Sequence, residues 1–125
     1  MNEDEISNVV IGAAIETHRV LGPGLLESVY QKCLARELEL LGLEFREEVP
    51  LPVSYKGMQF EAAFRLDMVV SEKVVIELKA VENILPIHEA QVLSYLRLAG
   101  CKLGLLINFN VPVLRLGIRR IVNKL

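Results

Sequence analysis

One hairpin pattern constrains the fold of this chain more than any other feature of its sequence. Residues 65–70 and 74–79 both alternate apolar and charged or small side chains, and the three polar residues between them suit a tight hairpin loop. Pairing the residues that flank this loop places Asp67 directly opposite Glu77. Alternation predicts that one face belongs to the core, with Leu66, Met68, Val70, Val74, Ile76 and Leu78. The other face carries Arg65, Asp67, Glu77 and Lys79.

The charged face has two interpretations. Two carboxylates directly opposed on neighbouring strands repel each other, so folding alone gives no reason for the Asp67–Glu77 pair. A divalent cation such as Mg²⁺ or Mn²⁺ would explain the pair, because it prefers carboxylate oxygens and waters as ligands. Lys79 could then position a water or offset charge on a phosphate. The alternative is a solvated face with diagonal Asp67–Lys79 and Glu77–Arg65 ion pairs. A bulge would shift the register and weaken the metal interpretation.

A helix expected over residues 25–41 adds a third acid. Its apolar stripe consists of Leu26, Val29, Tyr30, Cys33, Leu34 and Leu41. Glu27 lies at the margin of this stripe, where a carboxylate is costly unless it is paired or bound to a metal. Glu37 lies deeper in the stripe, and an ion pair with an arginine is the favoured interpretation there. Gly24, Glu27 and Tyr30 recur at three-residue steps and face the turn that Gly22 begins.

A helix expected over residues 86–99 presents a polar strip beside its core face. His88, Gln91 and Tyr95 fall within a sector of about 60° by the 3.6-residue repeat. Such a strip can hydrogen-bond a phosphate or a base. For His88 alone a structural role is the favoured interpretation, and His18 is a weaker candidate for the same reason.

The remaining segments complete a mixed α/β (α+β) domain that spans residues 1–125. Asn2 and Glu5 form a helix-start pattern, and apolar residues at helical spacing continue it to Leu21. Further strands are expected at residues 44–49, 53–55, 58–64 and 102–108, the last of them buried. Pro50 and Pro52 predict an irregular or edge-like segment. Residues 114–122 are expected to form a short apolar tail with interleaved arginines.

Composition excludes several classes of protein. With 52% apolar residues, 5 Pro and 8 Gly, the chain is not disordered. Charges interrupt every apolar run, and the acidic opening residues do not resemble a signal peptide. Two cysteines predict reduced thiols and a cytoplasmic location. Glycine-rich phosphate loops, zinc-binding Cys/His clusters and serine nucleophile elbows are absent from the sequence. The net charge of −2 argues against a general coat of nucleic-acid-binding charge.

The motif formed by Asp67, Glu77 and Lys79 resembles that of the PD-(D/E)XK nuclease superfamily. Gly24, Glu27 and Tyr30 also match the motif of its GxxExxY family, and the resemblance runs from about Ile6 to Val122. It implies a restriction-endonuclease-like αβββαβ core with one divalent-metal site, Mg²⁺ or Mn²⁺. Leu66 stands where the superfamily name carries proline, a position that shapes the strand end without taking part in chemistry.

The resemblance also implies a role for each candidate site residue. Asp67 and Glu77 would be metal ligands, with the Leu78 carbonyl as a possible further ligand. Lys79 would position the attacking water, and Glu27 would be the acid that the helix brings to the metal. The substrate-binding candidates are Gln91, Tyr95, His88 and Tyr30.

Two functions are carried forward from these observations. The leading hypothesis is a divalent-metal-dependent nuclease that hydrolyses DNA or RNA with metal-activated water. The alternative is a non-catalytic nucleic-acid- or protein-binding module that retains the nuclease fold, because the only basic cluster lies near the end of the chain at Arg115, Arg119, Arg120 and Lys124. The apolar excess also predicts a homodimer.

Overall fold

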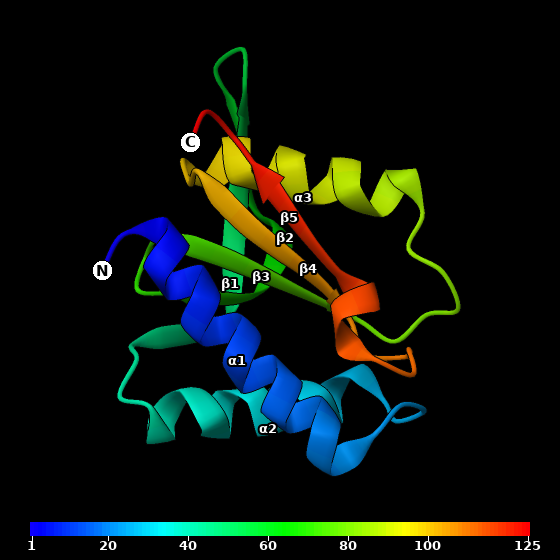
Figure 1. The fold of residues 1–125 in the computed structure, drawn as a ribbon. Helices are drawn as coiled ribbons and strands as arrows, with labels where there is room; N and C mark the ends of the chain where they lie inside the picture. Colours follow the sequence, from blue (N-terminus) through cyan, green and yellow to red (C-terminus); the bar gives the residue numbers. More distant parts are fainter.

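The computed structural model describes the backbone of residues 1–125 and all side chains except those of residues 62 and 63. The described backbone forms helices on both faces of a five-stranded mixed sheet (Figure 1). In chain order the elements are α1 (Glu3–Leu21), α2 (Glu27–Leu40), β1 (Phe45–Tyr55), β2 (Met58–Val70), β3 (Val74–Lys79), α3 (Pro86–Ala99), β4 (Leu103–Asn108), the 3₁₀ helix η1 (Leu114–Gly117) and β5 (Ile118–Val122). This architecture confirms the predicted fold class.

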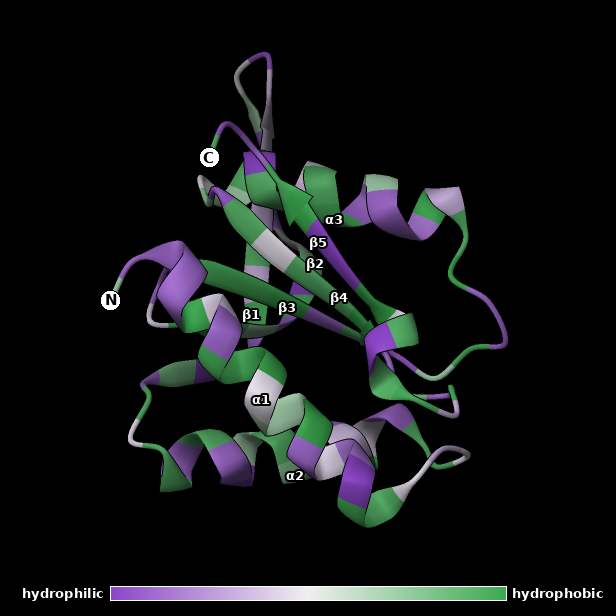
Figure 2. Ribbon diagram, in the orientation of Figure 1, coloured by the Kyte–Doolittle hydropathy of each residue, from purple (hydrophilic) through white to green (hydrophobic). Residues whose placement is uncertain are grey.

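The sheet follows the chain order β1-β2-β3-β4-β5. Only β3 and β4 pair in parallel, with α3 as the connection between them, while the other neighbours are antiparallel. Figure 2 shows β3 and β4 as hydrophobic over most of their length, as expected of central strands covered on both faces. The two core layers follow from this: α1 and α2 cover one face, and α3 covers the other.

Local signals in the sequence account for the helix boundaries. The Asn2 side chain accepts a hydrogen bond from the Glu5 N–H at 2.8 Å, and the Glu5 carboxylate accepts one from the Asn2 N–H at 2.9 Å. This capping box begins α1. Helix α3 begins at Pro86 and ends before Gly100, whose φ of +70° is left-handed. Both limits agree with the expected span of 86–99.

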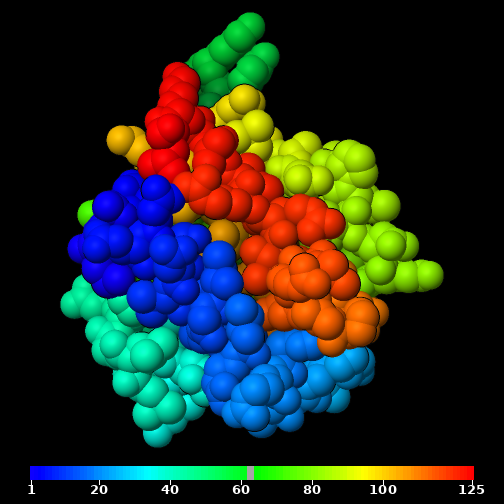
Figure 3. All heavy atoms as spheres, in the orientation of Figure 1, coloured from blue at the N-terminus to red at the C-terminus, as the bar shows by residue number. Residues whose placement is uncertain are grey.

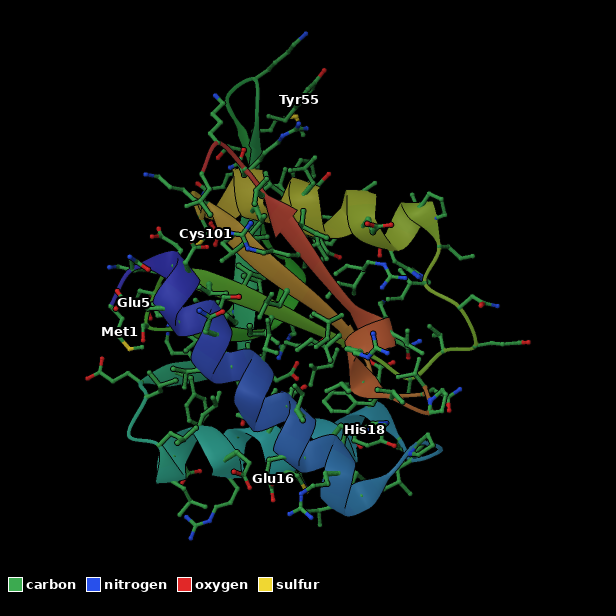
Figure 4. The ribbon with its side chains drawn as sticks, in the orientation of Figure 1. Met1, Glu5, Glu16, His18, Tyr55 and Cys101 are labelled. Carbon is green, nitrogen blue, oxygen red and sulfur yellow. The ribbon has the colours of Figure 1, made fainter. Side chains whose placement is uncertain are left out.

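The β1–β2 hairpin is longer than the sequence suggests. Pro50 and Pro52 do not end β1, but the predicted irregular, edge-like character is confirmed: β1 is an edge strand, and its pairing with β2 shifts register between Leu51 and Val53. Strand β2 is likewise one continuous element rather than two. The far end of this hairpin, which includes Tyr55, projects beyond the body of the molecule (Figures 1, 3 and 4).

Two further expectations are corrected by the structure. Leu66 does not share the core face of Met68: it packs with Val49 beneath α3, whereas Met68 packs beneath α1 and α2. The change of face falls where the β1–β2 pairing passes over Glu48, whose φ is +50°, so strict alternation fails at this irregularity. The residues expected to form only a short tail include a strand, because residues 118–122 form β5 on the free edge of β4.

Candidate active site at the β2–β3 fork

The two opposed acids lie where β2 and β3 separate. The strands pair in the predicted register, and the last paired residues before the separation are Met68 and Ile76. Beyond that point side chains replace the ladder: the Leu78 N–H donates to Asp67 Oδ2 at 2.8 Å, and the Asp67 N–H donates to Glu77 Oε1 at 3.1 Å. Each carboxyl group therefore uses one oxygen to hold the fork and keeps the other free of backbone donors.

Burial and mutual repulsion shift both carboxyl groups toward the protonated form. Glu77 is only 7% exposed. Its burial, and next the charge of Asp67, raise its pKa to about 8. Burial also raises the pKa of Asp67, although the hydrogen bond from the Leu78 N–H acts to lower it. At neutral pH Glu77 is therefore held mainly in its protonated form.

Glu27 and Lys79 complete the charged groups at the fork. Glu27 is the first residue of α2 and its side chain is exposed, yet partial desolvation and next the charge of Asp67 raise its pKa. The positive charge of Lys79 acts to lower the pKa of Glu27, Asp67 and Glu77. Within the described side chains, no three acidic, histidine or cysteine groups are already drawn together as a metal cluster. Glu27 is thus within electrostatic reach of the acid pair without joining it.

Gln31 and Glu48 also border the site, and the sequence did not reveal them. Gln31 Nε2 donates to Glu48 Oε1 at 3.0 Å and lies 3.4 Å from the Asp67 carbonyl oxygen. The charge of Glu48 contributes to the raised pKa of Asp67. Gln31 lies one turn after Glu27 on α2, so helical spacing was a usable signal. No sequence signal marks Glu48, because its approach depends on the irregularity in β1.

Helix α3 brings Gln91 and Tyr95 to the same face as the acids. Desolvation, and next the charges of Glu77 and Asp67, raise the pKa of Tyr95. Gln91 and Tyr95 line a common groove. His88 does not: its Nδ1 accepts a hydrogen bond from the Leu85 N–H at 3.0 Å, which stabilises the start of the helix.

Tyr30 serves the turn before α2. Its ring is fully buried and stacks on Phe109 with centroids 4.4 Å apart. Its hydroxyl donates to the Gly22 carbonyl at 2.6 Å and accepts from the Leu25 N–H at 3.1 Å. No part of this side chain reaches solvent, so it offers no surface to a substrate in this structure. His18 is also structural, because its Nε2 lies 2.8 Å from the Val111 carbonyl oxygen (Figure 4).

The ion-paired alternative for the fork is not what the structure contains. Among the side chains that the structure describes, the ion pairs are Arg19–Glu16, Arg36–Glu39, Arg46–Glu72 and Arg120–Asp4. None of them involves an acid of the fork, and Arg65 is exposed. The charge of the pair is thus limited by protonation of Glu77 and by the nearby Lys79 rather than by direct salt bridges among the described side chains.

Asn108 holds the chain segment that follows Lys79. It is buried, and its side chain accepts from the Val81 N–H at 3.0 Å and donates to the Val81 carbonyl at 2.9 Å. Its backbone lies opposite Lys79 in the parallel ladder. These bonds fix the path by which β3 leaves the sheet.

Replacing Asn108 with alanine should leave both Val81 groups without their partner. We expect a loss of about 1 to 3 kcal/mol in the free energy of unfolding, measured by urea denaturation. Asn110→Ala is the matched control, because the Asn110 side chain is exposed and its contact with the Val81 carbonyl is 3.5 Å long. Equal stabilities of the two variants would contradict this role of Asn108.

The residues of the fork fit a hard divalent cation. Carboxylate oxygens are the ligands that Mg²⁺ and Mn²⁺ prefer, and the Asp67–Glu77 pair keeps one oxygen on each side free of backbone donors. A divalent cation in place of the Glu77 proton would neutralise both carboxylates, while the backbone donors already hold the other oxygen of each.

A comparison with protein families agrees with this geometry. The family model of the PD-(D/E)XK nuclease superfamily matches residues 4–121, so the chain belongs to that superfamily. Nucleases of this superfamily are generally dependent on divalent metals and act on nucleic acid. No curated protein and no solved structure matches the chain. Within the part of the chain that the structure describes, no helix has the length and apolar character to cross a membrane.

Proposed function

We propose that this protein is a divalent-metal-dependent nuclease that hydrolyses a phosphodiester bond of DNA or RNA at the β2–β3 fork. The observation that carries the proposal is the Asp67–Glu77 pair, in which Glu77 is buried and held protonated and Asp67 is half-buried. Neither acid is in a salt bridge among the described side chains, and Lys79 follows Glu77 on the same strand. Asp67, Glu77 and Lys79 all lie at the end of the sheet where β2 and β3 separate.

Each residue has a distinct task in the proposed site. Asp67 and Glu77 would hold Mg²⁺ or Mn²⁺, with the Leu78 carbonyl as a further ligand and Glu27 completing the acidic set. The cation supplies charge neutralisation and Lewis acidity at the phosphate. Lys79 would orient the attacking water and offset the charge that develops on phosphate oxygens. Gln91 and Tyr95 would contact the substrate, and His88 borders them at the start of α3.

We further assign the chain to the GxxExxY family on the basis of the α1–α2 turn. Gly24 has a φ of +95°, which glycine adopts without strain. The Tyr30 hydroxyl closes the same turn through Gly22 and Leu25. These contacts present Glu27 at the first position of α2, so the motif is explained by the acid that it delivers to the fork.

The test combines cation binding with cleavage. Purified protein should bind Mn²⁺ in calorimetry and should cut labelled single- and double-stranded DNA or RNA in Mg²⁺ or Mn²⁺, but not in EDTA. Glu77→Ala should lose both properties, whereas Glu82→Ala, which removes an exposed glutamate of the loop after β3, should keep them. Absence of divalent-cation binding at millimolar concentration would contradict the enzyme and favour the binding module.

A further inference from the structure

A groove near the fork is lined by uncharged side chains, in contrast to the acidic fork itself. It is lined by Phe64 from β2 and by α3 residues between Ile87 and Leu98, and it encloses about 240 Å³. None of its lining residues is charged. Its polar groups come only from uncharged side chains, including Gln91 and Ser94. The groove is therefore unsuited to a phosphate and suited to an uncharged group that is flat or apolar.

Two aromatic rings form one wall of this groove. The centroids of Phe64 and Tyr95 are 5.5 Å apart, and their planes are tilted by 45°. Phe64 is 44% exposed, so its ring is supported by Tyr95 yet remains open to solvent. A ring held in place before binding loses little conformational entropy when a ligand stacks on it.

The groove lies near the proposed catalytic fork. Tyr95 is close enough to Glu77 and Asp67 that their charges raise its pKa. Phe64 precedes Asp67 by three residues on β2, which is roughly 10 Å along a strand. A chain of nucleotides with a phosphate at the fork would thus carry a neighbouring base past this wall.

We propose that Phe64, backed by Tyr95, is a stacking platform for a base of single-stranded nucleic acid, and that it selects unpaired substrate. The proposal rests on the proposed nuclease function, because the fork defines where the strand lies. Charge favours this orientation: the bases meet an uncharged groove, while the phosphates meet Lys79, which is in no ion pair among the described side chains. Bases within a duplex are stacked on each other and have no free face to offer.

Strand binding without cleavage tests this inference. Fluorescence anisotropy of labelled dT12 and rU12 is measured with Ca²⁺ replacing Mg²⁺ and again in EDTA, with gels to show that the strand stays intact. Stacking of one base is worth about 1 to 3 kcal/mol, so Phe64→Ala should weaken binding roughly 5- to 150-fold, and Phe64→Trp should restore it. A duplex of the same length should bind more weakly than the single strand.

Phe60→Ala is the matched control. Phe60 lies on the same strand, is similarly exposed at 48%, and does not line the groove. The Phe60→Ala variant should leave strand binding unchanged. In the wild-type protein, a strand that contains 5-iodouracil should photo-crosslink to Phe64 or Tyr95. Equal effects of the two alanine variants, or cross-links elsewhere, would overturn the inference. So would a dimer in sedimentation that Phe64→Ala dissociates while strand binding is retained, because the groove would then hold a second copy.

The two proposals fail in different ways. Phe64-dependent strand binding without any cleavage in Mg²⁺ or Mn²⁺ would contradict the nuclease and leave the platform intact. Cleavage of single strands that Phe64→Ala does not impair would contradict the platform and leave the nuclease intact.

Discussion

Replacing Lys79 with alanine should reduce the rate of phosphodiester hydrolysis about 10²- to 10⁴-fold. Among the described side chains, Lys79 is the one cation whose charge reaches Glu27, Asp67 and Glu77 together, so its loss would remove the group proposed to orient water and offset phosphate charge. Cation binding should persist, because the carboxylate ligands remain. Initial rates at saturating Mg²⁺ or Mn²⁺, together with calorimetry, measure the two properties separately.

The matched control for this variant is Lys73→Ala. Lys73 lies in the turn at the opposite end of β3, and its ammonium donates to the Met1 carbonyl at 2.9 Å. The Lys73→Ala variant should hydrolyse the substrate at the wild-type rate. Asp67→Asn should behave differently from both, with loss of cation binding as well as activity. Activity that survives in Asp67→Asn and in Lys79→Ala would refute the proposed mechanism.

Replacing Glu77 with glutamine should stabilise the protein in the absence of divalent cations, and more so as the pH rises. The pKa of Glu77 is raised from 4.5 to about 8 in the folded state. Between these values the unfolded chain has lost the proton that the folded chain keeps, so wild-type stability falls as pH rises through this window. Glutamine cannot ionise, and its amide oxygen can still accept from the Asp67 N–H.

We expect the variant to be more stable than the wild type by roughly 1 to 3 kcal/mol at pH 8, and by little near pH 4.5. Urea denaturation in EDTA at several pH values measures this difference, with the exposed Glu82→Gln as control. Excess Mg²⁺ or Mn²⁺ should reverse the order, because only the wild type gains stability from cation binding. A difference that does not change with pH would show that Glu77 is not held protonated.

The hairpin register was predictable because a short turn leaves little freedom in pairing. With residues 71–73 as the loop, Val70 must pair with Val74, and the acids then meet at the fork. The bounds of α3 were equally predictable, since Pro86 and Gly100 mark both ends. What alternation could not predict is the change of face at Leu66, because it follows from the backbone irregularity at Glu48.

Other features depend on contacts between distant segments. Strand β5 forms because β4 leaves a free edge, and nothing local to residues 118–122 reveals that pairing. Glu48 reaches the site through a side-chain contact with Gln31, which lies on a different element. Tyr30 could be placed on the correct turn from its spacing, but its burial against Phe109 could not be foreseen. Self-association remains a prediction, which light scattering at high micromolar concentration would test.

The central claim is that the Asp67–Glu77 fork binds a divalent cation with Glu27 beside it. Crystals soaked in Mn²⁺ test it most directly, because anomalous scattering locates the ion without reference to activity. The account predicts one anomalous peak between the free oxygens of Asp67 and Glu77, with Glu27 turned toward it and no peak in Glu77→Gln crystals. A fork without such a peak at millimolar Mn²⁺ would contradict it.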